Sequence, residues 1–302
     1  MNIGWKPLAL SAAVLLLLVC IPTTLGAIAL FLLMTPMVVL FTMLKPAAFA
    51  AYIVPVAAIA YLLLGGFGTI ALMVGLFFLV PAMVMGWLYK KEKPARTVLL
   101  AGFGVLLAEF LLELVVLSQQ FQVDWASELS AMLKTGLDTL QTDVALPPDW
   151  AQQTADTLGR AIVTMLPTLL LLSSFLFAAV THALSRRLLA WAGIAAPSLP
   201  PMRTWLMPRS LVLYYFAALL LSYVLPASGS GFWGVVAANL VPVLRFAFTI
   251  QAIAFFFFLT DVKRWPRAVP FVVSVPILLF PPLYLIGLLD VAFPLRRYFV
   301  KP

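Results

Sequence analysis

Residues 97–117, TVLLAGFGVLLAEFLLELVVL, decide the fold class of this chain, because they can cross a bilayer as one helix. A membrane-spanning helix needs about 20 consecutive, predominantly apolar residues. Two carboxylates, Glu109 and Glu113, stand inside this run. A charged side chain at the centre of such a helix costs about 2.5 to 3.5 kcal/mol on insertion scales, so it is tolerated where it faces protein or water. Four residues apart, the two glutamates share a helix face and indicate a polar surrounding within the membrane.

The composition places the whole chain in the same class. Of its 302 residues, 64% are hydrophobic and 10% are charged, whereas soluble domains average about 45–50% apolar and about 25% charged residues. No stretch of soluble composition is large enough to fold alone. We therefore predict an all-α polytopic transmembrane helix bundle, in which residues 1–302 form a single integral membrane domain.

Eight to nine spans are expected from the alternation of apolar runs and breaks. The runs are residues 8–25, 27–43, 48–64, 69–88, 97–117, 161–184, 210–225, 233–260 and 269–289. Nine spans from a cytoplasmic N-terminus would leave the basic C-terminus outside. The alternatives are that the last run bends back at Pro281-Pro282, that a basic C-terminus outside is simply tolerated, or that a miscount in the first apolar block moves the N-terminus.

The net charge of +8 reflects membrane topology rather than nucleic-acid binding. Lysine and arginine gather in three short connections, residues 90–96, 186–209 and 263–267. Basic residues in short loops mark the cytoplasmic side of a membrane protein. The bilayer is therefore the expected surrounding, and no nucleic-acid partner is expected.

Residues 118–160 form the only long polar segment, and their acidity places them outside the cytoplasm. Apolar residues from Trp125 to Leu140 recur at helical spacing and predict an amphipathic helix, which Pro147-Pro148 ends. Two interpretations of this extracytoplasmic insertion stay open. It is either a surface helix packed on the rim of the membrane domain or a lid over an external cavity.

Arg245 lies near the middle of the run 233–260. A guanidinium and two carboxylates inside a low-dielectric region need compensating charges, so we predict that Arg245 meets Glu109 and Glu113. The cluster is either a salt bridge that locks helices together or a mid-membrane binding site. Asn239 and Gln251 flank Arg245, and interhelical hydrogen bonding is their expected role.

Asp290 and Arg296 are expected to pair across a short turn as a structural lock at the membrane boundary. His182 is the only histidine, and without neighbouring His or Cys it is a poor metal ligand. Nucleophile elbows, P-loops, HExxH and GxGxxG patterns are absent from the sequence. We therefore expect no enzyme, no catalytic residues, no metal site and no cofactor.

Three stretches of the C-terminal half resemble the YybS-like family of predicted bacterial polytopic membrane proteins. They are WLMP at 205–208, NLVPVLRFAFTIQ at 239–251 and LIGLLDVAFPLR at 285–296. The chain departs from the family pattern at Ala252, where the family has glycine, and at Pro294, where a polar residue is usual. The resemblance implies a multi-pass protein of the bacterial cytoplasmic (inner) membrane, and it implies no established activity.

The N-terminal half resembles, in hydropathy, the substrate-binding components of energy-coupling-factor transporters. In those components a small-xxx-small pattern on the first helix meets the coupling subunit, and Ala9 and Ala13 fit that pattern. This resemblance implies a membrane-protein partner that binds through the first helix or the cytoplasmic loops.

Two functions stay open at this stage. The first is a transport-type protein that binds a small solute or lipid-like molecule in an intramembrane cavity lined by Glu109, Glu113 and Arg245. The second is a non-transporting membrane scaffold or assembly partner whose buried charges are structural. A cavity beside the glutamates would favour the first, and a dry, fully paired charge cluster would favour the second.

Overall fold

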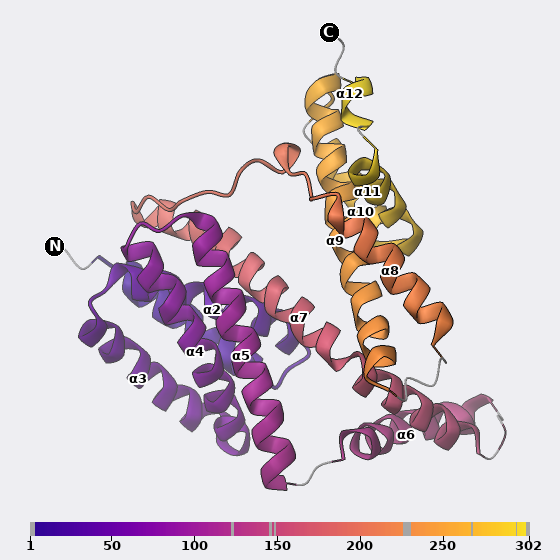
Figure 1. Ribbon diagram of the computed structural model, residues 1–302. Coiled ribbons are helices and arrows are strands. Elements are labelled where there is room, and N and C mark those ends of the chain that lie inside the picture. The colour runs from indigo at the N-terminus through magenta and orange to yellow at the C-terminus, as the bar shows by residue number, and fades with distance from the viewer. Residues whose placement is uncertain are drawn as a thin grey trace. The chain divides into compact units, whose positions relative to one another are not determined.

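The computed structural model describes residues 4–121, 124–144, 147, 149–225, 231–266, 268–293 and 295–299. Every regular element within these ranges is a helix (Figure 1), which confirms the all-α prediction. The α-helices are α1 (Lys6–Cys20), α2 (Gly26–Met43), α3 (Pro46–Leu64), α4 (Gly68–Lys90), α5 (Ala95–Phe121), α6 (Trp125–Val144), α7 (Trp150–Ala192), α8 (Ser210–Val224), α9 (Phe232–Lys263), α10 (Val269–Leu279), α11 (Tyr284–Ala292) and α12 (Leu295–Phe299). Three short 3-10 helices are η1 (Gly65–Phe67), η2 (Met202–Thr204) and η3 (Pro281–Leu283).

Several helical segments in the described part of the chain have the length and composition to cross a membrane. The five long ones are Gly26–Met43, Pro46–Lys90, Ala95–Gln120, Trp150–Ala192 and Phe232–Lys263. Of these, Pro46–Lys90 comprises α3, η1 and α4. Four shorter apolar helices are Lys6–Cys20, Ser210–Val224, Val269–Leu279 and Pro281–Ala292. The polytopic helical class is thereby confirmed, although several of the expected spans are shorter than a full crossing.

The run 269–289 forms two helices rather than one continuous span. Phe280 adopts an extended conformation (φ −111°, ψ 96°) at the end of α10. Pro281 and Pro282 follow and begin η3, and neither can donate a backbone hydrogen bond that would continue α10. The helix therefore breaks at Pro281-Pro282, where one of the alternatives placed a bend, and the side of the membrane on which the C-terminus lies stays a prediction.

The chain forms two compact units. The first unit comprises the described residues within 1–120 and 170–199, and the second comprises those within 121–169 and 200–302. Helix α7 thus contributes its C-terminal part to the first unit and its N-terminal part to the second. The prediction that residues 1–302 form a single integral membrane domain requires these two units to associate, and it stays a prediction.

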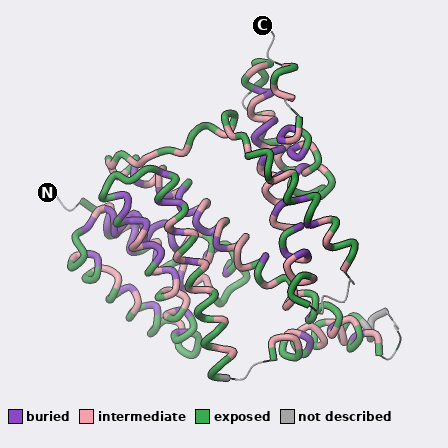
Figure 2. Tube along the Cα trace, in the orientation of Figure 1, coloured by how far each residue is buried: buried purple, intermediate pink, exposed green. Residues whose placement is uncertain are grey.

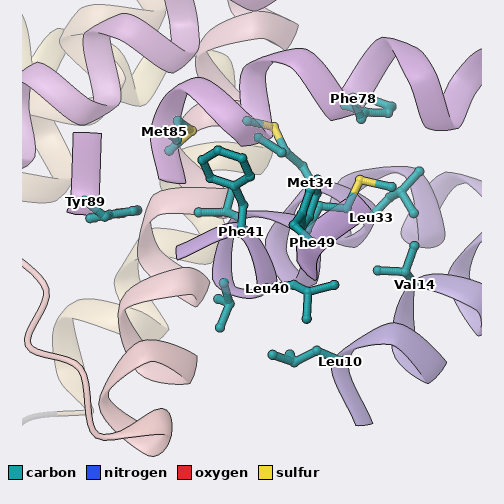
Figure 3. Packing of buried hydrophobic residues seen from close by; sticks show 14 of the residues in the cluster. Leu10, Val14, Leu33, Met34, Leu40, Phe41, Phe49, Phe78, Met85 and Tyr89 are labelled. Carbon is teal, nitrogen blue, oxygen red and sulfur yellow. The ribbon is translucent and has the colours of Figure 1, made fainter. Parts of the chain in front are cut away.

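Helix α2 is the central helix of the first unit. It carries no charged residue, and a helix that is apolar all round is expected to be buried. Twelve of its 18 residues are buried, including every residue from 33 to 42, and Figure 2 shows buried backbone gathered inside this unit. Figure 3 shows the side chains packed together in this core, among them Leu10, Val14, Leu33, Met34, Leu40, Phe41, Phe49, Phe78 and Met85. They bring α1, α2, α3 and α4 into one hydrophobic core.

Helix α9 organises the second unit, with α8, α10 and α11 packed against it. Gly287 lets α11 approach α9 closely, because a Cβ atom there would lie 1.9 Å from the carbonyl oxygen of Phe248. Only a residue without a side chain allows α11 to sit this near the backbone of α9. Tyr215, Leu244 and Phe248 fill the core between these helices.

Helix α6 packs against the beginning of α7 in the second unit. The hydroxyl of Ser130 donates to the carbonyl oxygen of Ala155 at 3.3 Å, and a Cβ atom at Gly159 would lie 2.6 Å from Ser130 Oγ. The helix predicted within residues 118–160 is therefore present. Its extracytoplasmic side and its role as a rim helix or a lid stay predictions.

Candidate functional site

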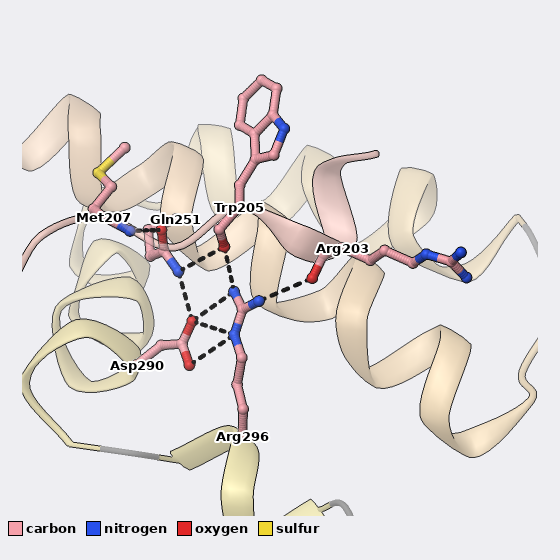
Figure 4. A network of polar contacts seen from close by, with 6 residues as sticks. All are labelled: Arg203, Trp205, Met207, Gln251, Asp290 and Arg296. Atoms are coloured by element: carbon pink, nitrogen blue, oxygen red, sulfur yellow. Dashed lines mark hydrogen bonds and ion pairs between the residues drawn. The ribbon is translucent and has the colours of Figure 1, made fainter. Parts of the chain in front are cut away.

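A buried polar network in the second unit joins α9, α11 and α12 to the connection that precedes α8 (Figure 4). At its centre is the carboxylate of Asp290, whose side chain is 0% exposed. The guanidinium of Arg296 donates to this carboxylate through Nη2 at 2.9 Å and Nε at 3.1 Å. Gln251 Nε2 donates to the same carboxylate at 2.7 Å. The predicted pairing of Asp290 with Arg296 is confirmed, and Gln251 makes the interhelical contact expected of it.

The same network holds the extended connection in front of α8. Arg296 Nη1 donates to the carbonyl oxygen of Arg203 at 2.9 Å, and Nη2 donates to that of Trp205 at 2.7 Å. The backbone N–H of Met207 donates to Gln251 Oε1 at 3.2 Å. The three stretches that carry the family resemblance thus meet at one place. Sequence reasoning from single residues missed the backbone groups of this connection, although the WLMP motif marks their position.

Asn239 of α9 binds the N-terminal half of α7. Its Oδ1 accepts from the backbone N–H of Thr168 at 2.9 Å and from the hydroxyl of Thr168 at 2.8 Å. Its Nδ2 donates to the carbonyl oxygen of Thr164 at 2.8 Å. Pro167 stands beside this contact and removes one donor from the ladder of α7. Asn239 therefore makes the interhelical hydrogen bonds that the sequence predicts.

Arg245 lies on α9 and contacts two tyrosines of its own unit. Its Nε donates to the hydroxyl oxygen of Tyr215 at 3.3 Å. The guanidinium carbon lies 5.4 Å from the ring centroid of Tyr284, and the two tyrosine hydroxyls share a hydrogen bond of 2.6 Å. Sequence analysis missed both tyrosines, because each stands in an apolar run where an aromatic side chain suggests lipid contact.

Glu109 and Glu113 lie on α5 in the first unit. Glu109 is half-buried, and its Oε2 atom is buried without a hydrogen-bond partner among the described residues. Glu113 is exposed. The glutamates belong to one unit and Arg245 to the other, so the predicted charge cluster stays a prediction.

A groove of about 600 Å³ opens in the first unit between α1, α2 and the C-terminal part of α7. Ala9 and Ala13 line it on α1, so the two small residues that the sequence singled out leave space between helices. Thr35 of α2 also lines the groove, and its hydroxyl is buried without a partner within the described ranges. The lining residues are Ala9, Leu10, Ala13, Leu17, Leu32, Thr35, Pro36, Leu184, Arg187, Leu188 and Trp191.

Cationic and aromatic side chains gather around Trp191, which lines this groove. Lys6 Nζ donates to the carbonyl oxygen of Trp191 at 3.0 Å and lies 5.2 Å from the centroid of its ring. Trp5 packs edge-on against Trp191, with the ring centroids 5.3 Å apart. Arg187 lines the groove one helical turn before Trp191. Tryptophan and basic residues together are typical of the membrane–water interface.

His182, on α7 in the first unit, is buried. It is 3% exposed, and its Nδ1 shares a hydrogen bond of 2.6 Å with the hydroxyl of Tyr89. Within the described residues, no group of three or more His, Cys, Asp or Glu side chains is placed to hold a metal ion.

Comparisons with known proteins give a family without an assigned activity. The family described as "Predicted membrane protein (DUF2232)" matches residues 9–291. The uncharacterised protein YybS of Bacillus subtilis (strain 168) is 24% identical over an alignment length of 301, and the match covers 96% of this chain and 95% of that protein. No solved structure matches the chain.

Proposed function

We propose that this chain, which belongs to the DUF2232 family of predicted membrane proteins, is a transport-type protein. Its proposed ligand is a lipid-like molecule that it binds within the bilayer. The observation that carries the proposal is the groove between α1, α2 and α7. Its volume of about 600 Å³ lies in the range of ligand pockets, about 300–1,000 Å³. Such a volume can hold part of an acyl chain.

The chemistry of the groove favours an amphiphile over a polar solute. Eight of its eleven lining residues are alanine, leucine or proline, which offer a polar solute few hydrogen-bonding groups. Each methylene of an acyl chain moved from water into such a site contributes about 0.8 kcal/mol. The lipids around a membrane helix are the most abundant molecules of this kind.

The groove combines apolar walls with nearby cationic groups, as the binding site of an amphiphile requires. Arg187 lines the groove, and Lys6 donates to the carbonyl oxygen of Trp191, which also lines it, so both cations favour a polar or anionic headgroup nearby. Basic residues near a membrane helix attract anionic lipid headgroups by about 1 kcal/mol each. The rest of the groove suits the chain of the same molecule. We therefore propose that the ligand lies with its headgroup towards Lys6 and Arg187.

Lipid retained by the purified protein tests the proposal. In Ala13→Trp the indole fills the groove, whereas Ala12→Trp places the same side chain on the neighbouring exposed position, which does not line it. We expect native mass spectrometry in detergent to show a retained lipid in the wild type and in Ala12→Trp, and its loss in Ala13→Trp. Equal retention by both variants, or no retained lipid in the wild type, would contradict the proposal.

A non-transporting scaffold is the second candidate, and the polar network of the second unit favours it. The charges of Asp290 and Arg296 are paired with each other, and their remaining hydrogen-bonding groups reach Gln251 and backbone carbonyls. Such saturation is expected of groups that hold helices together. If the chain is only a scaffold, no specific lipid is retained by any variant of the groove.

A further inference from the structure

A second pocket, of about 540 Å³, lies in the second unit where α9 ends and α10 begins. It is separate from the groove of the first unit and shares no residue with it. Its lining combines apolar walls with hydroxyl and charged groups. The lining residues are Pro201, Met202, Arg203, Phe257, Thr260, Asp261, Arg264, Trp265, Pro270 and Phe271.

Thr260 presents an unused hydroxyl in this lining. A threonine inside a helix commonly bonds the carbonyl four residues back, as Thr42 does to Val38 at 2.7 Å and Thr249 does to Arg245 at 2.9 Å. Thr260 is only 8% exposed, yet its Oγ1 has no hydrogen-bond partner among the described residues. A buried hydroxyl without a hydrogen-bond partner is costly, so a ligand that accepts a hydrogen bond from Thr260 would be stabilised here.

The charges of the pocket do not cancel. Arg203 and Asp261 form an ion pair with each other. Arg264 lines the same pocket, and no hydrogen bond or ion pair of its guanidinium is present in the described structure. One positive charge is therefore left over beside the hydroxyl of Thr260.

The backbone of Arg264 supports a role for its side chain. Its φ of 54° and ψ of 36° are left-handed, a conformation that glycine or asparagine adopts more easily than arginine. The backbone N–H of Arg264 also caps α9 by donating to the carbonyl oxygens of Asp261 and Thr260. This cap reduces the partial negative charge that a helix C-terminus would otherwise present to an anion.

We propose that this pocket binds the phosphate group of a phosphorylated ligand. The guanidinium of Arg264 matches phosphate oxygens in charge and geometry, and the hydroxyl of Thr260 donates a further hydrogen bond. Phe257, Pro270 and Phe271 provide an apolar wall beside these groups. A phospholipid headgroup and a soluble phosphorylated compound share this chemistry.

Two variants and one matched control test the site in the full-length protein. Arg264→Asn removes the charge but tolerates the left-handed backbone, and Thr260→Val removes the hydroxyl while keeping the shape. Lys263→Asn removes the same charge from the adjacent residue, which is exposed and does not line the pocket. Thermal melting in detergent is followed with inorganic phosphate, dioctanoyl phosphatidic acid and the phosphate-free dioctanoylglycerol.

We expect a phosphate probe to raise the melting temperature of the wild type and of Lys263→Asn, while dioctanoylglycerol has no such effect. Arg264→Asn and Thr260→Val should each weaken this binding roughly tenfold or more, the amount expected for one hydrogen bond to a charged group. A shift with inorganic phosphate identifies a soluble source, and a shift with phosphatidic acid alone identifies a lipid headgroup. The proposal is overturned if neither phosphate probe shifts the melting temperature, or if Lys263→Asn weakens binding as much as Arg264→Asn.

Discussion

Removing Arg296 should destabilise the second unit more than removing the charge of its partner, Asp290. In Arg296→Met the carboxylate of Asp290, with 0% side-chain exposure, keeps only the hydrogen bond from Gln251. Leaving one partner of a buried ion pair uncompensated costs about 3 to 5 kcal/mol. The guanidinium of Arg296 is 17% exposed and also binds the carbonyl oxygens of Arg203 and Trp205. In Asp290→Asn the Arg296 guanidinium therefore still has hydrogen-bond acceptors and contact with water. We expect this variant to lower the free energy of unfolding by a smaller amount, about 1.5 to 3 kcal/mol.

The double variant shows whether the two residues act as a pair. Residues in one hydrogen-bond network commonly show coupling energies of about 0.5 to 3 kcal/mol. Because these two side chains share three hydrogen bonds, we expect a value in the upper half of that range. The assay is equilibrium unfolding in mixed detergent micelles, followed by tryptophan fluorescence.

The exposed ion pair between Lys134 and Asp138 provides the control for this cycle. Its side chains are 41% and 49% exposed, so Lys134→Met should change stability by about 0.5 kcal/mol or less. The reasoning is refuted if Asp290→Asn costs more than Arg296→Met. It is equally refuted if the two single effects simply add in the double variant.

Three further predictions concern two observed contacts and the charge cluster that the sequence predicts. Gly287→Ala should destabilise α11 by about 1 to 3 kcal/mol or more, because the added Cβ atom would lie 1.9 Å from a carbonyl oxygen of α9; the melting temperature measures this loss. Tyr89→Phe should cost about 1 to 3 kcal/mol in the same assay, since it leaves the buried Nδ1 of His182 without its 2.6 Å partner. Glu109→Gln combined with Arg245→Met should be less destabilising than the sum of the single variants if the sequence-predicted charge cluster forms, as a double-mutant cycle would show.

Each of these predictions has its own control or contrary result. Gly104→Ala introduces a Cβ atom with no neighbour within 4 Å, so a loss as large as that of Gly287→Ala would show that helix packing is not the cause. His182→Phe in the Tyr89→Phe background removes both partners and should recover part of the lost stability. Additive effects of the Glu109 and Arg245 variants would show that no charge cluster forms.

The helical class and most helix boundaries could be predicted because hydrophobic runs and prolines act locally. A membrane segment must satisfy its backbone hydrogen bonds internally, so a long apolar run is a helix wherever it lies in the fold. The prolines at 281 and 282 end α10 for an equally local reason. The pairing of Asp290 with Arg296 could also be predicted from the sequence, since the two residues are only six positions apart.

The remaining contacts depend on residues that are distant in sequence. Asn239 and Thr168 are 71 positions apart, and Arg245 and Tyr215 are 30 apart. Threonine and tyrosine are compatible with an apolar run, so nothing in the local pattern marks them as partners. The groove could not be predicted from the sequence either. Alanines such as Ala9 and Ala13 are common in membrane helices, and they line a cavity only where the neighbouring helices leave space beside them.

Mapping where a lipid contacts the protein tests the central claim most directly. A phospholipid with a photoreactive diazirine in its acyl chain would be crosslinked to the purified protein in bilayer nanodiscs, and the labelled peptides identified by mass spectrometry. The account predicts labelling concentrated on the groove-facing residues of α1, α2 and the C-terminal part of α7, and its loss in Ala13→Trp but not in Ala12→Trp. Labelling spread over all apolar helices in proportion to their exposure, unchanged by Ala13→Trp, would contradict it.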